Sequence, residues 1–165
     1  MSGTRIKVIF ASMAVLGMML ITSCDPSKKY EEDEENAIQS YLLDNFALQF
    51  EHKPSGLYYL EVKAGTGNLP VKSDTAYVKY TGKFLDGTVF DTNVGKPDTL
   101  IFPVDEGWMI PGFDECVLYM RPGGKALTLV PSKLAYGPTG YYIIGGYTPL
   151  LFDIELVKLV KGPNK

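Results

Sequence analysis

The amino-acid sequence predicts an α+β domain in which antiparallel strands pack against one short helix. Three patterns support this class. The side chains of residues 76–84 alternate between two faces and lead into an Asp-Gly turn, which is typical of a β-hairpin. A short helix with one apolar face is predicted after Pro111. Residues 150–156 again place apolar side chains at every second position, which predicts a final strand.

The first 23 residues have the features of a secretory signal peptide. Arg5 and Lys7 precede an uncharged apolar run at residues 8–21, which is too short to be assigned as a membrane span. The run leads into Ile-Thr-Ser-Cys at residues 21–24, and this motif resembles a bacterial lipobox, whose cysteine becomes the lipidated first residue of the mature protein. We therefore predict lipid anchoring at Cys24 in the bacterial cell envelope, on its periplasmic or surface side. An ordinary signal peptide that leaves Cys24 as an incidental thiol is the alternative.

The composition predicts one globular domain with extensions and disfavours a nucleic-acid partner. The chain has 165 residues, of which 45% are hydrophobic and 21% are charged. Removal of residues 1–23 leaves 14 basic and 19 acidic side chains, a net charge of -5. If Cys24 carries lipid, Cys116 is the remaining thiol and cannot form an intramolecular disulfide. We expect Cys116 to be a small buried apolar residue.

An N-terminal extension is expected at residues 24–53, ahead of a domain at residues 54–161. Residues 25–35 are charged and nearly devoid of apolar side chains, which predicts a solvated tether. An amphipathic helix is predicted at residues 36–50, because apolar side chains recur there at every fourth position. The helix is expected to pack against its own domain or to space it from the membrane, and weak self-association through residues 36–50 is the alternative.

The elements of the domain follow in order. Pro54-Ser55-Gly56 ends the helix, and residues 57–62 are predicted to form the first strand. The hairpin at residues 76–91 turns at Asp86-Gly87 and brings Tyr80 close to Asp91. In the short helix, apolar residues at spacings of three, four and seven share one face, and residues 126–130 form a later strand.

Four segments of this pattern together resemble an FKBP-type peptidyl-prolyl cis-trans isomerase. They are VKYTGKFLDGTVFD at 78–91, MIPGFDECVLYM at 109–120, LTLVPSKLAYG at 127–137 and LLFDIELVKL at 150–159. The resemblance covers residues 56–160. It implies an antiparallel half-barrel sheet of five or six strands wrapped around one short helix, with a shallow apolar pocket between them.

The resemblance also implies which residues form the pocket. The residues expected to act in catalysis are Tyr80, Asp91, Ile110 and Tyr136. The residues expected to bind substrate are Phe90, Phe102, Met109, Phe113, Ile144 and Phe152. Phe113 is the expected pocket floor, the Ile110 N-H and the Tyr136 hydroxyl are expected to bind substrate carbonyls, and Asp91 with Tyr80 is expected to hold the polar edge.

The function that this resemblance implies is prolyl isomerisation during the folding of exported proteins. Rotation about an X-Pro bond breaks no covalent bond, so an apolar pocket that desolvates and twists the amide suffices. No cofactor or metal is expected, since the only histidine, His52, precedes the domain and no Cys/His cluster has metal-ligand spacing. The expected partners are proline-containing polypeptides and, through Cys24, a membrane.

A module that binds proline-containing segments without catalysis is the alternative function. Phe113 stands where the family usually has tryptophan, and Gly145-Gly146 replaces a more rigid family sequence. The freedom of these glycines predicts a mobile loop. Tyr141 and Tyr142 could add aromatic surface to the pocket rim.

Overall fold

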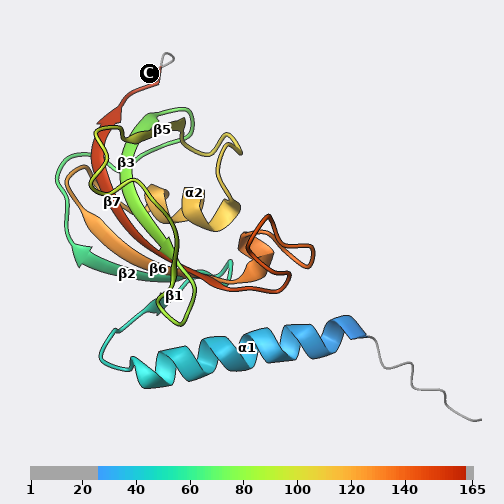
Figure 1. Ribbon diagram of the computed structural model, residues 1–165. Coiled ribbons are helices and arrows are strands. Elements are labelled where there is room, and N and C mark those ends of the chain that lie inside the picture. The colour runs from blue at the N-terminus through green and yellow to red at the C-terminus, as the bar shows by residue number, and fades with distance from the viewer. Residues whose placement is uncertain (1–25, 163–165) are drawn as a thin grey trace, which may run out of the picture.

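A curved antiparallel sheet encloses a short helix in the computed structural model of the protein, which describes residues 26–162 (Figure 1). The seven strands are β1 (Glu51–His52), β2 (Tyr58–Lys63), β3 (Thr75–Lys83), β4 (Val89–Thr92), β5 (Leu100–Pro103), β6 (Lys125–Val130) and β7 (Leu150–Val160). The predicted signal peptide at residues 1–23 and the lipidation site at Cys24 lie outside the described residues.

The sheet has the order β1-β2-β6-β7-β3-β4, and β5 pairs with the first half of β3. The predicted α+β class and hairpin are therefore confirmed, with β4 returning along the second half of β3. The sheet has seven strands where five or six were expected, and three of them are short: β1 has two residues, and β4 and β5 have four each. The β3-β7 pairing is the longest and lies in the interior of the sheet.

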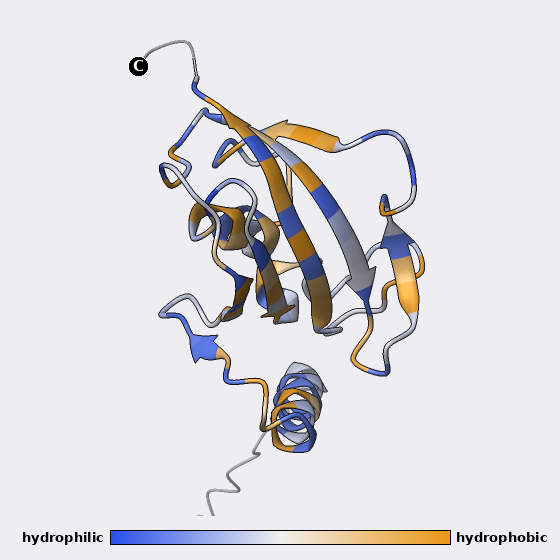
Figure 2. Ribbon diagram, turned by 90° about the vertical axis from the view of Figure 1, so that its left-hand side faces the viewer, coloured by the Kyte–Doolittle hydropathy of each residue, from blue (hydrophilic) through white to orange (hydrophobic). Residues whose placement is uncertain are grey.

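The core lies between the inner face of this sheet and α2 (Pro111–Leu118), as Figure 1 shows. The predicted apolar face of α2 is confirmed, because Phe113, Cys116 and Val117 are all buried. Alternate residues of β7 at positions 150–156 are buried as well. This alternation is visible as bands of hydrophobic and hydrophilic residues along the strands in Figure 2. Cys116 is a free thiol, as expected for a small core residue, and burial raises its pKa.

The N-terminal helix differs from its prediction. Helix α1 (Pro26–Asp44) already includes most of the segment expected to be a tether, and it ends before Phe50. Glutamate and lysine are good helix formers, so a charged segment can still be helical. The helix crosses one end of the domain (Figure 1), and Ile38 is its buried residue.

Ile38 packs against Tyr58, Leu129 and Leu151, which form a small apolar cluster separate from the main core. The prediction that the helix packs against its own domain is confirmed for this face. Phe46, which was expected on the same ridge, lies beyond the helix end and is 80% exposed. Neither helix within residues 26–162 is long and apolar enough to cross a membrane.

Candidate functional site

A pocket of about 300 Å³ opens between the inner face of the sheet and the start of α2. Strand β3 contributes Tyr80, β4 contributes Phe90 and Asp91, and β7 contributes Phe152. The remaining lining residues come from the segment entering α2, from α2 itself and from the loop between β6 and β7: Trp108, Met109, Ile110, Phe113, Tyr136 and Tyr141. Residues far apart in the sequence therefore meet at one mostly aromatic site.

Phe113 forms the aromatic floor of this pocket. Its ring meets the rings of Tyr80, Phe102 and Phe152 at centroid distances of 5.6, 5.9 and 5.4 Å, with each pair near edge-to-face. This arrangement of rings is a favoured one. Phe90 makes a further edge-to-face contact with Phe152 at 5.7 Å. The floor and walls are therefore held rigidly by ring packing.

Glycine at position 82 makes room for the Phe90 wall. A Cβ atom there would lie 2.5 Å from the Phe90 ring, closer than side chains tolerate. Position 82 lies on the same face of β3 as Tyr80 and Val78, so the missing side chain is replaced by a ring from the neighbouring strand. Glycine at position 82 of the hairpin is thus needed for Phe90 to take its place in the pocket wall.

Tyr80 and Asp91 form the polar edge. The Tyr80 hydroxyl donates a hydrogen bond to Asp91 Oδ2, and the Asp91 side chain is exposed at the pocket mouth. Burial, followed by this hydrogen bond and the Asp91 charge, raises the pKa of Tyr80 well above its ordinary value. Tyr80 is therefore a protonated donor at neutral pH, and it holds the carboxylate in one orientation.

Asn93 fixes this edge to the backbone of β3. Its side chain accepts a hydrogen bond from the Tyr80 N-H at 2.8 Å and donates to the Val78 carbonyl at 3.0 Å. The Thr92 hydroxyl also donates to the Tyr80 carbonyl at 2.9 Å. Side chains just beyond the hairpin thus fix the position of Tyr80.

Two hydrogen-bond donors at the pocket have no partner among residues 26–162. The Ile110 carbonyl accepts bonds from the N-H groups of Phe113 and Asp114 at 3.0 and 3.1 Å, but the Ile110 N-H makes none within the described chain. The Tyr136 hydroxyl is likewise unbonded there. Burial, with smaller effects of Tyr141 and Asp91, raises the pKa of Tyr136, so its hydroxyl stays protonated.

Phe102 and Ile144 do not line the pocket, although the sequence placed them in its substrate-binding set. Both are buried in the main core, and the Phe102 ring contacts the Phe113 ring. Trp108 lines the pocket and was not in that set; it is 72% exposed. A single tryptophan in a loop directly before Met109 and Ile110 is the signal that could have identified it. Tyr141 also lines the pocket and stacks on Tyr136 at 5.3 Å.

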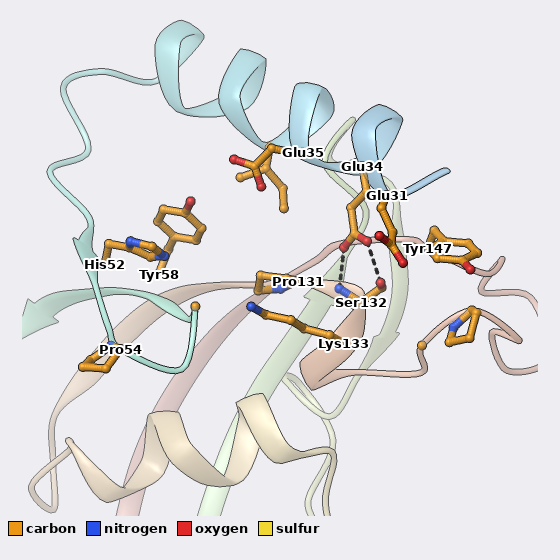
Figure 3. Close-up of a pocket in the computed structure, with 14 residues that line it drawn as sticks. Glu31, Glu34, Glu35, His52, Pro54, Tyr58, Pro131, Ser132, Lys133 and Tyr147 are labelled. Atoms are coloured by element: carbon orange, nitrogen blue, oxygen red, sulfur yellow. Dashed lines mark hydrogen bonds between the residues drawn. The ribbon is translucent and has the colours of Figure 1, made fainter. Parts of the chain in front are cut away.

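A second and larger cavity, of about 650 Å³, lies between α1 and the domain (Figure 3). It is lined by glutamates of α1 and by polar residues and prolines of the domain, and it lacks the ring-packed floor of the smaller pocket. His52 borders it, is exposed, and stacks on Tyr58 at 4.4 Å. No group of three or more possible metal ligands lies together within residues 26–162. The smaller, aromatic pocket is therefore the candidate site.

Comparison with known proteins identifies relatives of the domain. The family model described as FKBP-type peptidyl-prolyl cis-trans isomerase matches residues 67–157. The protein named "Outer membrane protein MIP" from Legionella longbeachae is 45% identical over 111 residues, covering 66% of this chain and 46% of that protein. The "Macrophage infectivity potentiator" of Trypanosoma cruzi is 34% identical over 169 residues, covering 94% of this chain and 84% of that protein.

Solved structures share the fold as well. The crystal structure of FkpA from Escherichia coli superposes with a TM-score of 0.69 at 33% identity, covering 83% of this chain and 65% of that one.

The protein named as FKBP-type peptidyl-prolyl cis-trans isomerase FkpA from Aeromonas hydrophila is 42% identical over 107 residues, which is 39% of its length. The chain thus spans less than half of these bacterial curated relatives.

Proposed function

Because the chain belongs to the FKBP-type peptidyl-prolyl cis-trans isomerase family, we propose that it catalyses rotation about X-Pro bonds of polypeptides in the aromatic pocket. The observation that carries this proposal is the coincidence in one pocket of an aromatic floor, two donors without a partner among residues 26–162, and the Asp91 carboxylate held by Tyr80. This arrangement suits a reaction in which an amide loses its conjugation and no covalent bond is broken.

The barrier to this rotation comes from amide resonance. It is about 18–20 kcal/mol, and X-Pro bonds interconvert in tens to hundreds of seconds without catalysis. Water stabilises the planar, charge-separated amide more than the twisted one. A proline ring seated on Phe113, beside Phe90 and Phe152, would leave water behind, and so the barrier to twisting would fall.

The polar groups then orient the substrate. The Ile110 N-H donates to a carbonyl of the bound segment, and the Tyr136 hydroxyl donates to another. The Tyr80-Asp91 hydrogen bond keeps the polar edge of the pocket in a fixed position next to the amide that rotates. Each 1.4 kcal/mol by which the pocket stabilises the twisted state over the planar one raises the rate about tenfold, so partial desolvation of the amide suffices for useful catalysis.

A proline-limited refolding assay tests the proposal. The chain from residue 25 onward should accelerate the slow refolding phase of a substrate protein. Tyr136→Phe should lower kcat/KM several-fold, because it removes one donor, on the order of 1 kcal/mol. Tyr142→Phe is the matched control, since Tyr142 is exposed and does not line the pocket. Absence of acceleration by the unaltered chain would show the proposal to be wrong.

A non-catalytic binding module is the second candidate, and the exposed aromatic rim favours it. Trp108 and Tyr141 present large surface around a floor that is phenylalanine. Saturable binding of a proline-containing peptide without any acceleration of its isomerisation would support this function. Measurable turnover of the same peptide would eliminate it as the main account.

We further propose that lipidated Cys24 holds the protein at the cell envelope, where its substrates are exported proteins. The support is the signal-like sequence of residues 1–23 and the outer-membrane name of one relative. Cells given a labelled fatty acid should label the protein, and Cys24→Ser should abolish the label and release the protein from membranes. An unlabelled wild-type protein would favour the ordinary signal peptide.

Weak self-association through residues 36–50 is proposed for the face of this segment that the domain leaves uncovered. Leu43 and Phe46 are both exposed there. Sedimentation at rising concentration should reveal dimers, and Phe46→Ser should weaken them. A monomer at all concentrations would limit the helix to packing on its own domain.

A further inference from the structure

Two contacts join α1 to the segment that connects β6 with β7. The first is a pair of hydrogen bonds in Figure 3: Glu34 accepts from the Ser132 N-H at 2.5 Å and from the Ser132 hydroxyl at 2.6 Å. The second is a ring stack between Tyr30 and Tyr147, with centroids 5.5 Å apart and planes inclined by 17°. Residues 30 and 34 are one turn apart and share a face of α1.

The two contacts lie at the two ends of one loop, residues 137–147, and we call these ends its neck. The Ser132 carbonyl accepts hydrogen bonds from the Ala135 and Gly137 N-H groups, each at 2.8 Å. The Gly137 carbonyl in turn accepts from the Tyr147 N-H at 3.0 Å. The bonds therefore form a circuit from α1 through Ser132, Gly137 and Tyr147 back to α1, and this circuit closes the base of residues 137–147.

The loop carries the rim of the candidate pocket. Tyr136 lies immediately before the neck, and its ring stacks on Tyr141 inside the loop. Tyr141 and Ile144 exchange two backbone hydrogen bonds at 2.8 and 2.9 Å, which makes the loop internally compact. A compact loop moves largely as a unit, so the position of its neck affects where the Tyr136 hydroxyl lies.

We propose that Glu34 and Tyr30 are positioning residues, through which α1 holds this loop and thereby places Tyr136 at the pocket. The proposal rests on the isomerase function proposed above. Ser132 is 4% exposed, so its N-H and hydroxyl would be left without a partner if the Glu34 carboxylate were removed. The hydrogen bonds to Glu34 are charge-assisted, which makes them stronger than neutral ones.

The expected effect is on substrate binding more than on turnover. A misplaced Tyr136 loses a contact that both the planar and the twisted substrate use, so KM should rise while kcat changes little. Glu34→Ala should raise KM about fivefold, within the tenfold that corresponds to 1.4 kcal/mol. Glu34→Gln should restore much of the affinity, because an amide can still accept from the Ser132 N-H.

Matched variants separate positioning from a general effect of charge or packing. Glu31→Ala removes another carboxylate that borders the same cavity, and it should leave KM unchanged. Tyr30→Ala should raise KM, whereas Tyr30→Phe keeps the ring and should behave as the wild type. Circular dichroism and thermal melting of each variant identify any that fail to fold.

Hydrogen exchange gives a readout that does not depend on catalysis. In Glu34→Ala and Tyr30→Ala, the amides of residues 135–147 should exchange faster, while those of β3 and β7 should not. An inactive wild-type chain would refute the isomerase function. Hydrogen exchange would still show whether Glu34 and Tyr30 hold the loop. Unchanged exchange in these variants would show that α1 does not hold the loop. Faster exchange with an unchanged KM, in a protein that is active, would show that the contacts hold the loop but do not position Tyr136.

Discussion

The Tyr80-Asp91 hydrogen bond offers a sharp test of how the pocket edge works. Tyr80→Phe removes the hydroxyl and leaves the ring, which packs edge-to-face on Phe113 at 5.6 Å. A hydrogen bond to a charged group contributes about 1.5–3 kcal/mol. Asp91 is exposed, so water replaces part of the lost bond, and we expect about 1 kcal/mol, or roughly fivefold, in kcat/KM.

A double-mutant cycle measures whether the two side chains act together. Asp91→Asn alone and Tyr80→Phe alone should each lower kcat/KM in a peptide isomerisation assay, and the double variant should be little worse than either. The coupling energy should then be about 1 kcal/mol. Unfolding of Tyr80→Phe in denaturant should differ from the wild type by less than about 1 kcal/mol, because its ring packing is intact.

Tyr77→Phe is the matched control, since Tyr77 lies on the opposite face of the same strand and does not line the pocket. It should leave kcat/KM unchanged. The reasoning would be refuted if Tyr80→Phe retained full activity, or if the effects of the two pocket substitutions simply added.

Three further predictions concern the floor, the core and the loop. Phe113→Leu keeps an apolar side chain but loses the ring contacts, and it should cost about 2 kcal/mol in denaturant unfolding and lower kcat/KM. Burial raises the pKa of Asp114 from 3.8, partly offset by the Asp105 N-H. The protonated Asp114 side chain is the form that suits the folded protein, so its contribution to folding stability is fully present below the unfolded pKa and is lost as the pH rises through the folded pKa. Asp114→Asn should therefore match the wild type in acid and exceed it in melting temperature at neutral pH; a constant difference would contradict this assignment. A Cβ at Gly146 would lie 2.0 Å from the Pro138 carbonyl oxygen, so Gly146→Ala should weaken peptide binding and lower stability by about 1–3 kcal/mol, and unchanged binding would show that the loop can adapt.

Gly146 illustrates what the sequence leaves open about a loop. Two adjacent glycines predict mobility when only backbone freedom is considered. In the structure the absent side chain makes room for a backbone carbonyl, so steric space is the reason for glycine at this position. Mobility of the loop remains a prediction for hydrogen exchange to test.

The pocket residues divide in the same way. Tyr80 and Asp91 were predicted to meet because the hairpin that joins them is local and its register follows from a short turn. Phe102 and Ile144 were placed in the pocket by family resemblance, but their depth depends on how β5 and the loop pack on α2. Trp108 was missed although it lies close before Met109 and Ile110, because its place at the pocket rim depends on how the segment entering α2 packs beside the sheet.

The sequence by itself determined the hairpin, the apolar face of α2 and the final strand, because each depends on the period of side chains within a few residues. Only the tertiary structure decided that Glu34 reaches Ser132, 98 residues further along the chain. No local sequence pattern predicts such a contact. It exists because the folded sheet brings the start of the β6-β7 connection beneath the helix, where a buried N-H and hydroxyl need an acceptor.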